Sequence, residues 1–200
     1  MIPHRKEAMK LLMDAQHDNP GPWALHSLSV AHCAEKIAQA CGMDKEKAYV
    51  LGLLHDIGRK FGKRHLGHVS YGYSYMMELG YEEAARVCLS HSFHNQSVED
   101  YVGNLDTSEA EEKLIREKLA QMDYDDYDRL VQLCDAIGGS EGVMDMEERM
   151  NDVEKRYGFY PEQKREANRK LKAYFEEKMK NDIYTVCEKG SFRPIMSYNE

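Results

Sequence analysis

Residues 53–63 read Leu-Leu-His-Asp-Ile-Gly-Arg-Lys-Phe-Gly-Lys, and this stretch decides the fold. His55 and Asp56 stand at the end of an apolar run, in a helix expected to cover residues 45–56 and to end at Gly58. A carboxylate buried at a helix end without a partner costs several kcal/mol of folding free energy. The pair therefore indicates metal ligands, although an ordinary helix that ends in His-Asp-x-Gly would read the same.

Four cations follow the pair, at Arg59, Lys60, Lys63 and Arg64, all within one stretch of six residues. Cations beside a metal site suit an anionic substrate, because they stabilise negative charge. For Lys60 and Arg64 a solvated surface position is an equal alternative. The sequence thus predicts an anion-binding segment directly after the metal ligands.

The composition is that of a globular protein without a membrane span. Hydrophobic residues make up 42% of the chain, and no apolar run reaches the roughly 20 residues that a bilayer requires. Five cysteines, an odd number without Cys-x-x-Cys spacing, favour reduced thiols in a cytoplasmic protein. No apolar segment follows the basic N-terminus, so no secretory signal is expected.

The charge is unevenly distributed. The formal net charge is −8, and residues 97–128 alone hold eleven acidic and three basic side chains. Residues 55–70 are locally basic within this acidic chain. Binding to a nucleic-acid polymer depends on neutralising many phosphates and is therefore not expected. A small phosphorylated ligand fits better.

The periodicity predicts an all-α fold, because each long segment has helical spacing and no alternating strand stands out. We expect three parts: an N-terminal helix and linker (1–21), a metal-binding helical domain (22–138) and a C-terminal helical extension (139–200). The extension could be an appendage or an oligomer contact, such as that of a homodimer. The helices are predicted over residues 5–17, 22–41, 45–56, 66–79, 82–92, 108–120, 124–137, 143–157 and 161–185.

Helical phase sorts the histidines, seven of which lie between residues 26 and 94. At about 100° per residue, four of them share a stripe with apolar neighbours, whereas His32 lies among polar ones. Asp135 lies at the edge of an apolar stripe. One buried histidine is more often a hydrogen-bonded core residue than a ligand, but four on different helices with two Asp favour one shared metal centre. The inward set is His26, His55, Asp56, His68, His91 and Asp135.

A set of imidazoles and carboxylates without thiolates suits divalent Fe, Mn, Co or Zn. The order of the short motifs that contain these residues resembles the H…HD…D signature of the HD-domain metal-dependent phosphohydrolase superfamily. His26 stands in His-Ser-Leu-Ser-Val-Ala, the pair 55–56 in Leu-Leu-His-Asp-Ile-Gly, and Asp135 in Leu-Cys-Asp-Ala-Ile. The resemblance covers roughly residues 22–138 and implies an all-α bundle that binds metal through these residues.

Two further histidines resemble those of the two-metal bacterial branch, which includes HD-type diadenosine tetraphosphate hydrolases. His68 matches an H-x-x-x-G helix and His91 a histidine that ends the next helix. The resemblance implies two ions bridged by Asp56, one completed by His26 and Asp135, the other by His68 and His91. Departing from that pattern, the interval between residues 56 and 68 is short, which leaves the substrate open. His65, on nearly the same face, is an alternative to His68.

The resemblance implies hydrolysis of a phosphoester or phosphoanhydride bond in a nucleotide-like substrate by a hydroxide that the metal generates. Asp56, Arg59 and Lys63 are the expected catalytic residues. The expected substrate-binding residues are Arg59, Lys60, Lys63, Arg64 and His65. A proton donor to the leaving group could be His65 or His94, and tyrosines 71, 73 and 75 could stack on a base. The alternatives are an HD-fold di-iron oxygenase and a non-catalytic nucleotide-binding module.

Overall fold

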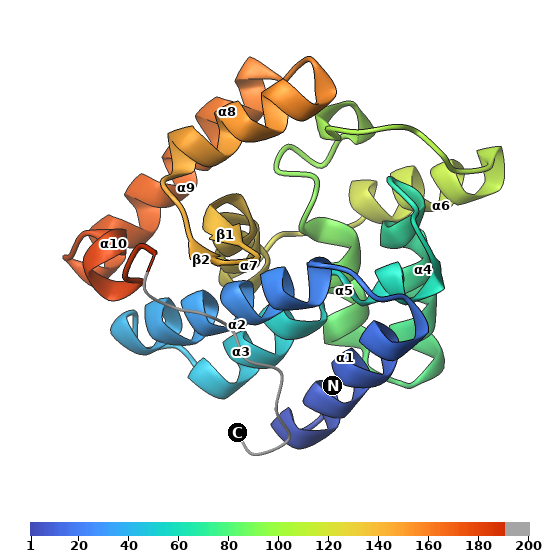
Figure 1. Cartoon of the computed structure of the whole chain (residues 1–200), viewed down its shortest axis with the longest axis horizontal. Helices are drawn as coiled ribbons and strands as arrows, with labels where there is room; N and C mark the ends of the chain where they lie inside the picture. The colour runs from blue at the N-terminus through green and yellow to red at the C-terminus, as the bar shows by residue number, and fades with distance from the viewer. Residues whose placement is uncertain (191–200) are drawn as a thin grey trace.

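The structure, a computed structural model, describes residues 1–190 and is an all-α bundle with one small hairpin (Figure 1). None of the helices among these residues is both long and apolar enough to cross a bilayer. The elements in order are α1 (Arg5–Asp18), α2 (Trp23–Ala40), α3 (Lys45–Leu54), η1 (Ile57–Phe61), α4 (Gly67–Glu78), α5 (Glu82–Ser90), η2 (Val98–Asp100), α6 (Glu109–Ala120), α7 (Asp126–Ile137), β1 (Gly138–Gly139), β2 (Gly142–Val143), α8 (Met146–Tyr157), α9 (Glu162–Met179) and α10 (Ile183–Val186).

The capping signals in the sequence set several helix starts. The Asp44 carboxylate accepts from the backbone amides of Glu46 and Lys47 at the start of α3, as the sequence predicts. Ser108 and Glu111 form the predicted capping box of α6. Each cap satisfies backbone donors that a helix start leaves without partners.

The helix that carries His55 ends earlier than predicted, and this difference shapes the site. The α3 helix stops at Leu54, and Asp56 has φ −104° and ψ 11°, outside the helix. In a continuous helix two adjacent side chains diverge by about 100°. Because the chain leaves the helix between them, the side chains of His55 and Asp56 can face the same centre.

Two further expectations were wrong in detail. Residues 138–143 form an antiparallel hairpin that the sequence analysis missed, with Gly139 opposite Gly142. The segment predicted as one helix over 161–185 is divided into α9 and α10 at Lys180, whose φ is 55°. A positive φ cannot continue a right-handed helix, so the chain turns there.

The core lies where α2, α3 and α7 pack together. Gly52 brings α3 against α2 so closely that a Cβ there would lie 2.9 Å from the Cα of Ala31. A second apolar cluster beneath α4, α5 and α6 contains Leu66, Leu89 and Phe93. The two clusters hold the ends of α3, α4, α5 and α7 in fixed positions around the bundle's centre.

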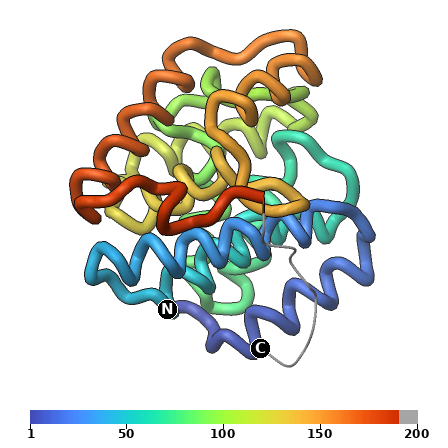
Figure 2. The backbone as a smooth tube through the Cα atoms, turned by 60° about the vertical axis from the view of Figure 1, so that its left-hand side comes forward, coloured from blue at the N-terminus to red at the C-terminus, as the bar shows by residue number. Residues whose placement is uncertain are grey.

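The C-terminal helices form a layer over one side of this bundle. In Figure 2 the α8–α10 segment lies across α2, and α9 packs against both α7 and α2. The thiol of Cys187 donates to the Cys33 carbonyl at 3.7 Å, which joins the end of α10 to α2. Residues 139–190 therefore pack on the helices that carry His26 and Asp135.

Candidate metal centre

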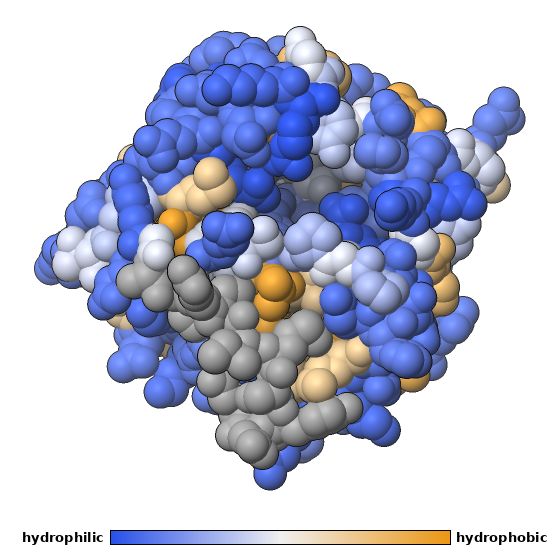
Figure 3. Space-filling view, viewed as in Figure 1, coloured by the Kyte–Doolittle hydropathy of each residue, from blue (hydrophilic) through white to orange (hydrophobic). Residues whose placement is uncertain are grey.

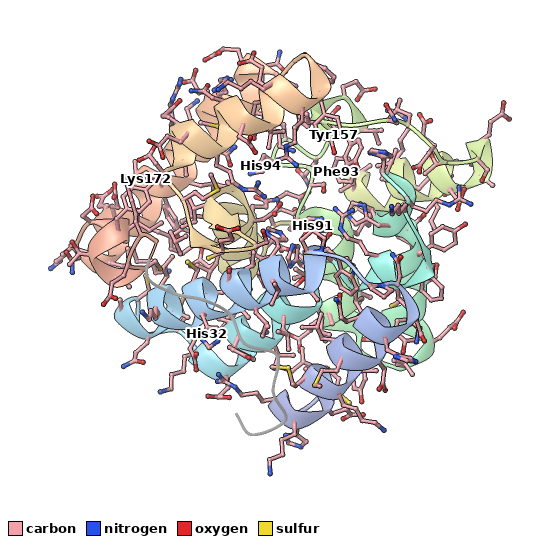
Figure 4. All side chains as sticks on the ribbon, in the orientation of Figure 1. His32, His91, Phe93, His94, Tyr157 and Lys172 are labelled. Carbon is pink, nitrogen blue, oxygen red and sulfur yellow. The ribbon has the colours of Figure 1, made fainter. Side chains whose placement is uncertain are left out.

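The structure brings together all six residues that the sequence analysis predicts as ligands. His26 lies in α2, His55 and Asp56 follow α3, His68 lies in α4, His91 follows α5, and Asp135 lies in α7. The side chains of residues 55, 56, 68 and 91 are all at most 4% exposed. Figure 4 shows His91 pointing into the middle of the bundle.

The first group of donors consists of His26, His55 and Asp135. The His26 Nε2 atom lies 3.0 Å from Asp135 Oδ1 and 3.3 Å from His55 Nε2. The His55 Nε2 atom lies 3.8 Å from the same Asp135 oxygen. Three ligand atoms this close together are spaced so that they could hold one metal ion.

The second group shares Asp56. Its Oδ1 atom lies 3.1 Å from His68 Nε2 and 3.6 Å from His91 Nε2, and these two nitrogens are 3.3 Å apart. The other carboxylate oxygen, Oδ2, lies 4.0 Å from His55 Nε2. Asp56 therefore lies between the two groups, with Oδ1 against His68 and His91 and with Oδ2 bound by Arg59 at 2.5 Å and farther from His55.

All four histidines are oriented in the same way. In each, Nδ1 contacts a backbone carbonyl, so the proton resides on Nδ1 and the Nε2 lone pair faces the centre. The carbonyls belong to Gly138 for His26 (3.1 Å), Gly52 for His55 (2.7 Å), His65 for His68, and Val87 for His91 (3.2 Å). The backbone thus presents four nitrogen acceptors to the two groups of the candidate centre.

These contacts leave electron-rich atoms facing one another, which tests whether a cation fits. With their protons on Nδ1, His68 Nε2 and His91 Nε2 have no hydrogen to share across 3.3 Å. The buried Oδ1 of Asp56 has no hydrogen-bond partner among the described residues. Unsatisfied buried acceptors are costly. Positive charge between them would satisfy all of these atoms, so the residues fit a metal.

The protonation states agree with this fit. Burial lowers the pKa of His91 to about 3 and also lowers the pKa of His55, so both rings are neutral. Burial alone would raise the pKa of Asp56, but the Arg59 guanidinium beside it holds that pKa well below its usual range. Metal ligands require these deprotonated forms.

Two glycines let the η1 segment approach α4. A Cβ on Gly58 would lie 1.9 Å from the His68 carbonyl oxygen and 2.5 Å from the Gly72 amide nitrogen. A Cβ on Gly72 would lie 3.2 Å from the Gly58 amide nitrogen. The close approach of these backbones sets the distance between Asp56 and His68.

A cavity of about 540 Å³ opens from the centre and lies within the size range of small-molecule sites. In Figure 3 the surface is hollowed between α8 and α2, with mainly hydrophilic residues around the opening. Among the predicted cations, Arg59, Lys63 and Arg64 line the cavity, as does His65. The Arg59 Nε atom also donates to Asp56 Oδ2 at 2.5 Å.

Lys60 is placed differently from the other predicted cations. Its Nζ atom pairs with Asp18 at 3.0 Å, and it is not among the residues that line the cavity. His94 lines a separate hollow, and burial lowers its pKa to about 3. Neither residue therefore lines the cavity that opens from the candidate centre.

Other expectations for the segment after Asp56 also change. His65 contacts the Tyr157 ring at 6.1 Å between centroids, while His68 faces Asp56, so the geometry favours His68 as the ligand. The tyrosines at 71, 73 and 75 do not line the cavity, and rings 71 and 75 pack on Phe61. The aromatic residues that do line it are Trp23, Tyr101, Tyr157 and Tyr160.

The C-terminal helices contribute a wall of the cavity that was not predicted from the sequence. Arg149 of α8 and Lys164 of α9 line the cavity together with Tyr160. Burial lowers the pKa of Lys164 to about 8. No local motif marks these residues, and their position depends on how α8 and α9 pack on α7. The signal that marks this wall is the burial of Lys164, whose side chain is 9% exposed, and this burial is visible only in the folded structure.

His32 lies on the outer side of α2, away from His91 (Figure 4). Its ring packs edge-on against Tyr49 at 5.4 Å, and its Nδ1 atom lies 3.7 Å from Glu35. This position agrees with the helical phase, which separated it from His26. The same helix therefore provides a histidine inside the centre and one outside it.

Comparison with known proteins identifies the family. Residues 23–138 match the family model described as HD domain, and this range contains all six candidate ligands. Searches of curated proteins and of solved structures found no match to the chain. Most members of the family are metal-dependent hydrolases, and the His and Asp groups described above could bind metal. The chain belongs to the HD-domain family.

Proposed function

We propose that the protein is a two-metal phosphohydrolase that cleaves a phosphoester or phosphoanhydride bond of a small, nucleotide-like substrate. The observation that carries the proposal is the position of Asp56 between two groups of histidine nitrogens. Its Oδ1 atom faces His68 and His91 and has no hydrogen-bond partner in the described part of the chain, while Oδ2 accepts from Arg59 and lies 4.0 Å from His55. A carboxylate in this position suits a bridge between two cations.

We assign His26, His55 and Asp135 to one ion. His68 and His91 would hold the other, with Asp56 common to both. His55 also lies close enough to Asp56 and His91 to take part in the second site. The mixture of imidazole and carboxylate favours Fe, Mn, Co or Zn. When bound, such ions would polarise phosphoryl oxygens and lower the pKa of a water molecule, so that hydroxide is available to attack phosphorus near neutral pH.

The chain itself supplies the anion-binding surroundings. Arg59 holds the Asp56 carboxylate in place and adds positive charge beside it. Six Lys or Arg side chains line the cavity against two Asp, an excess of four positive charges on a chain of net charge −8. A concave positive site of this kind attracts an anionic substrate and stabilises the charge that develops on its phosphoryl group. Lys63 and Arg64 would contact that group from the exposed side.

The aromatic lining supports a nucleotide as the substrate class. Trp23, Tyr101, Tyr157 and Tyr160 give the cavity flat apolar surfaces next to its cations. Aromatic rings stack on bases with little dependence on base identity. A substrate with a phosphate at the centre and a base on these rings would use both features.

The test is purification with metal analysis, followed by a phosphate-release screen over nucleoside mono-, di- and triphosphates and dinucleoside polyphosphates. We expect metal in the protein and phosphate release that disappears in Asp56→Asn. The variant His32→Ala is the matched control and should retain both. Consumption of O₂ without phosphate release would instead support the HD-fold oxygenase, and binding without either reaction a nucleotide-binding module.

A further inference from the structure

The cavity has two walls that carry cations, and only one of them adjoins the HD pair. Arg59, Lys63 and Arg64 come from the segment after Asp56, whereas Arg149, Arg156 and Lys164 come from α8 and α9. The walls meet where the rings of His65 and Tyr157 contact each other. Figure 4 shows Tyr157 on the α8 side. The second wall thus brings positive charge beyond what the centre's own segment supplies.

Arg149 differs from the other arginines of α8 and α9 in having no acidic partner. Arg156 pairs with Asp152 at 3.1 Å, Arg165 with Glu154 at 2.8 Å and Arg169 with Glu147 at 2.7 Å. Within residues 1–190, Arg149 forms no ion pair, and its buried Nε atom has no hydrogen-bond partner. The one unpaired arginine of these two helices is therefore a half-buried one that lines the cavity.

Lys164 is the second unpaired cation of this wall. Its side chain is 9% exposed, and its Nζ atom donates to the carbonyl oxygens of Ser92 (2.8 Å) and Asp100 (3.2 Å). The Asp100 carboxylate is turned toward Asn95, from which it accepts two hydrogen bonds. An ammonium group has three N–H donors. One N–H donor of Lys164 is therefore left over, and no acidic side chain among the described residues pairs with its charge.

We propose that Arg149 and Lys164 form a second anion subsite, which binds the anionic group of the substrate that is not cleaved. The proposal rests on the phosphohydrolase function proposed above and narrows its substrates to compounds with at least two anionic groups, such as nucleoside di- and triphosphates. Buried charges require a partner. The two unpaired cations face a cavity whose only carboxylates, among its described lining residues, are the candidate ligands Asp56 and Asp135.

The test measures binding without turnover. The probes are a non-hydrolysable methylene analogue of adenosine diphosphate and, for one anionic group, phenyl phosphate, each titrated calorimetrically into the protein as purified. Arg149→Gln should weaken binding of the analogue by about 10- to 100-fold, the value of a charge-assisted hydrogen bond. Binding of phenyl phosphate should change by less than about threefold. Lys164→Gln should act in the same direction as Arg149→Gln.

Matched controls remove a charge from the same helices outside the cavity. Lys155→Gln on α8 and Lys170→Gln on α9 should leave both affinities unchanged, since these side chains are exposed. Arg149→Lys, which keeps the charge, should recover part of the lost affinity. Because Lys164 is buried and its variant could fail to fold, Arg149→Gln decides the result, with thermal unfolding as the check on folding.

The outcomes separate the subsite from the proposed reaction. Equal weakening of both probes, no change in Arg149→Gln, or no binding of the analogue to the wild type would overturn the subsite. Phosphate release by the wild type together with any of these results would leave the proposed function standing. Arg149-dependent binding of the analogue without phosphate release from any nucleotide would support the subsite and contradict the hydrolase.

Discussion

The Nε2 atom of His68 lies 3.1 Å from Oδ1 of Asp56, yet no hydrogen bond joins the two atoms. The His68 ring holds its proton at Nδ1 against the His65 carbonyl, so its Nε2 atom can only accept. Two acceptors packed this closely in a buried site repel each other unless positive charge lies between them. This relationship supports a cation beside His68 and Asp56, which is the second of the two proposed ions.

The first prediction concerns metal retention. His55→Ala and Asp135→Ala should each lower metal affinity by more than about 100-fold, because each removes a ligand. Loss of a residue that only hydrogen-bonds to a ligand lowers metal affinity by about 10- to 100-fold. His32→Ala should retain the metal. Metal content after dialysis, measured by mass spectrometry, checks all three. Loss of metal from His32→Ala with retention in His26→Ala would show that the assignment of the α2 face is wrong.

The second prediction concerns the approach of η1 to α4. Gly58→Ala should lower the free energy of unfolding by about 3 kcal/mol, since its Cβ would overlap the backbone of α4 at His68 and Gly72. The same displacement should separate Asp56 from His68 and reduce the number of bound ions. Denaturant unfolding and metal analysis measure the two effects.

Gly42→Ala is the control for that variant. Gly42 has φ +69°, and nothing lies within 4 Å of an added Cβ. The alanine should cost about 1 kcal/mol through backbone conformation alone and leave the metal content unchanged. Equal losses of stability and metal in both variants would contradict the role given to Gly58.

The candidate ligands were predictable because helical phase is a local property. The phase placed His26 inward and His32 outward on one helix, and the structure has them on those sides. The sequence also contained the caps at Asp44 and Ser108. What phase could not show is that α3 ends at Leu54, since a break in backbone conformation depends on packing against α4.

The second wall of the cavity was not predictable, because it depends on tertiary packing and not on a local property of the sequence. Arg149 and Lys164 lie in highly charged helices, where one unpaired cation looks like any other in the sequence. Their separation from acidic partners appears only when α8 and α9 pack on the bundle. Similarly, Lys60 resembled its neighbours in the sequence, but its pairing with Asp18 of α1 turns it away from the cavity.

The third prediction concerns pH. Burial lowers the pKa of Lys164 to about 8 in the folded protein, below its ordinary value of 10.5. Between these values the unfolded chain binds more protons, so stability rises with pH. The free energy of unfolding of the wild type relative to Lys164→Met should therefore increase by up to about 3 kcal/mol from pH 8 to 10.5. A pH-independent difference in metal-free protein would show that the lysine is not desolvated.

The fourth prediction concerns the segment that carries Lys63, Arg64 and His65. The Asp106 carboxylate accepts from the backbone amides of His65 (2.8 Å) and Gly67 (2.9 Å), which fixes this segment at the cavity. Asp106→Ala should raise KM by about tenfold with a smaller change in kcat, because it loosens substrate-binding groups and leaves the centre intact. Steady-state kinetics on the substrate found in the phosphate-release screen measures the effect.

Asp123→Ala is the control for Asp106→Ala, because its side chain is exposed and outside the cavity. It removes the same charge and should leave KM unchanged. A fall in kcat with unchanged KM in Asp106→Ala would place the defect at the centre and contradict the positioning role.

The central claim is that Asp56 bridges two ions. Anomalous diffraction from crystals grown with manganese tests it directly. We predict two peaks per chain, one on each side of the Asp56 carboxylate, and the loss of only the peak beside His68 and His91 in His91→Ala. A single peak among His26, His55 and Asp135 in the wild type would contradict the two-metal centre.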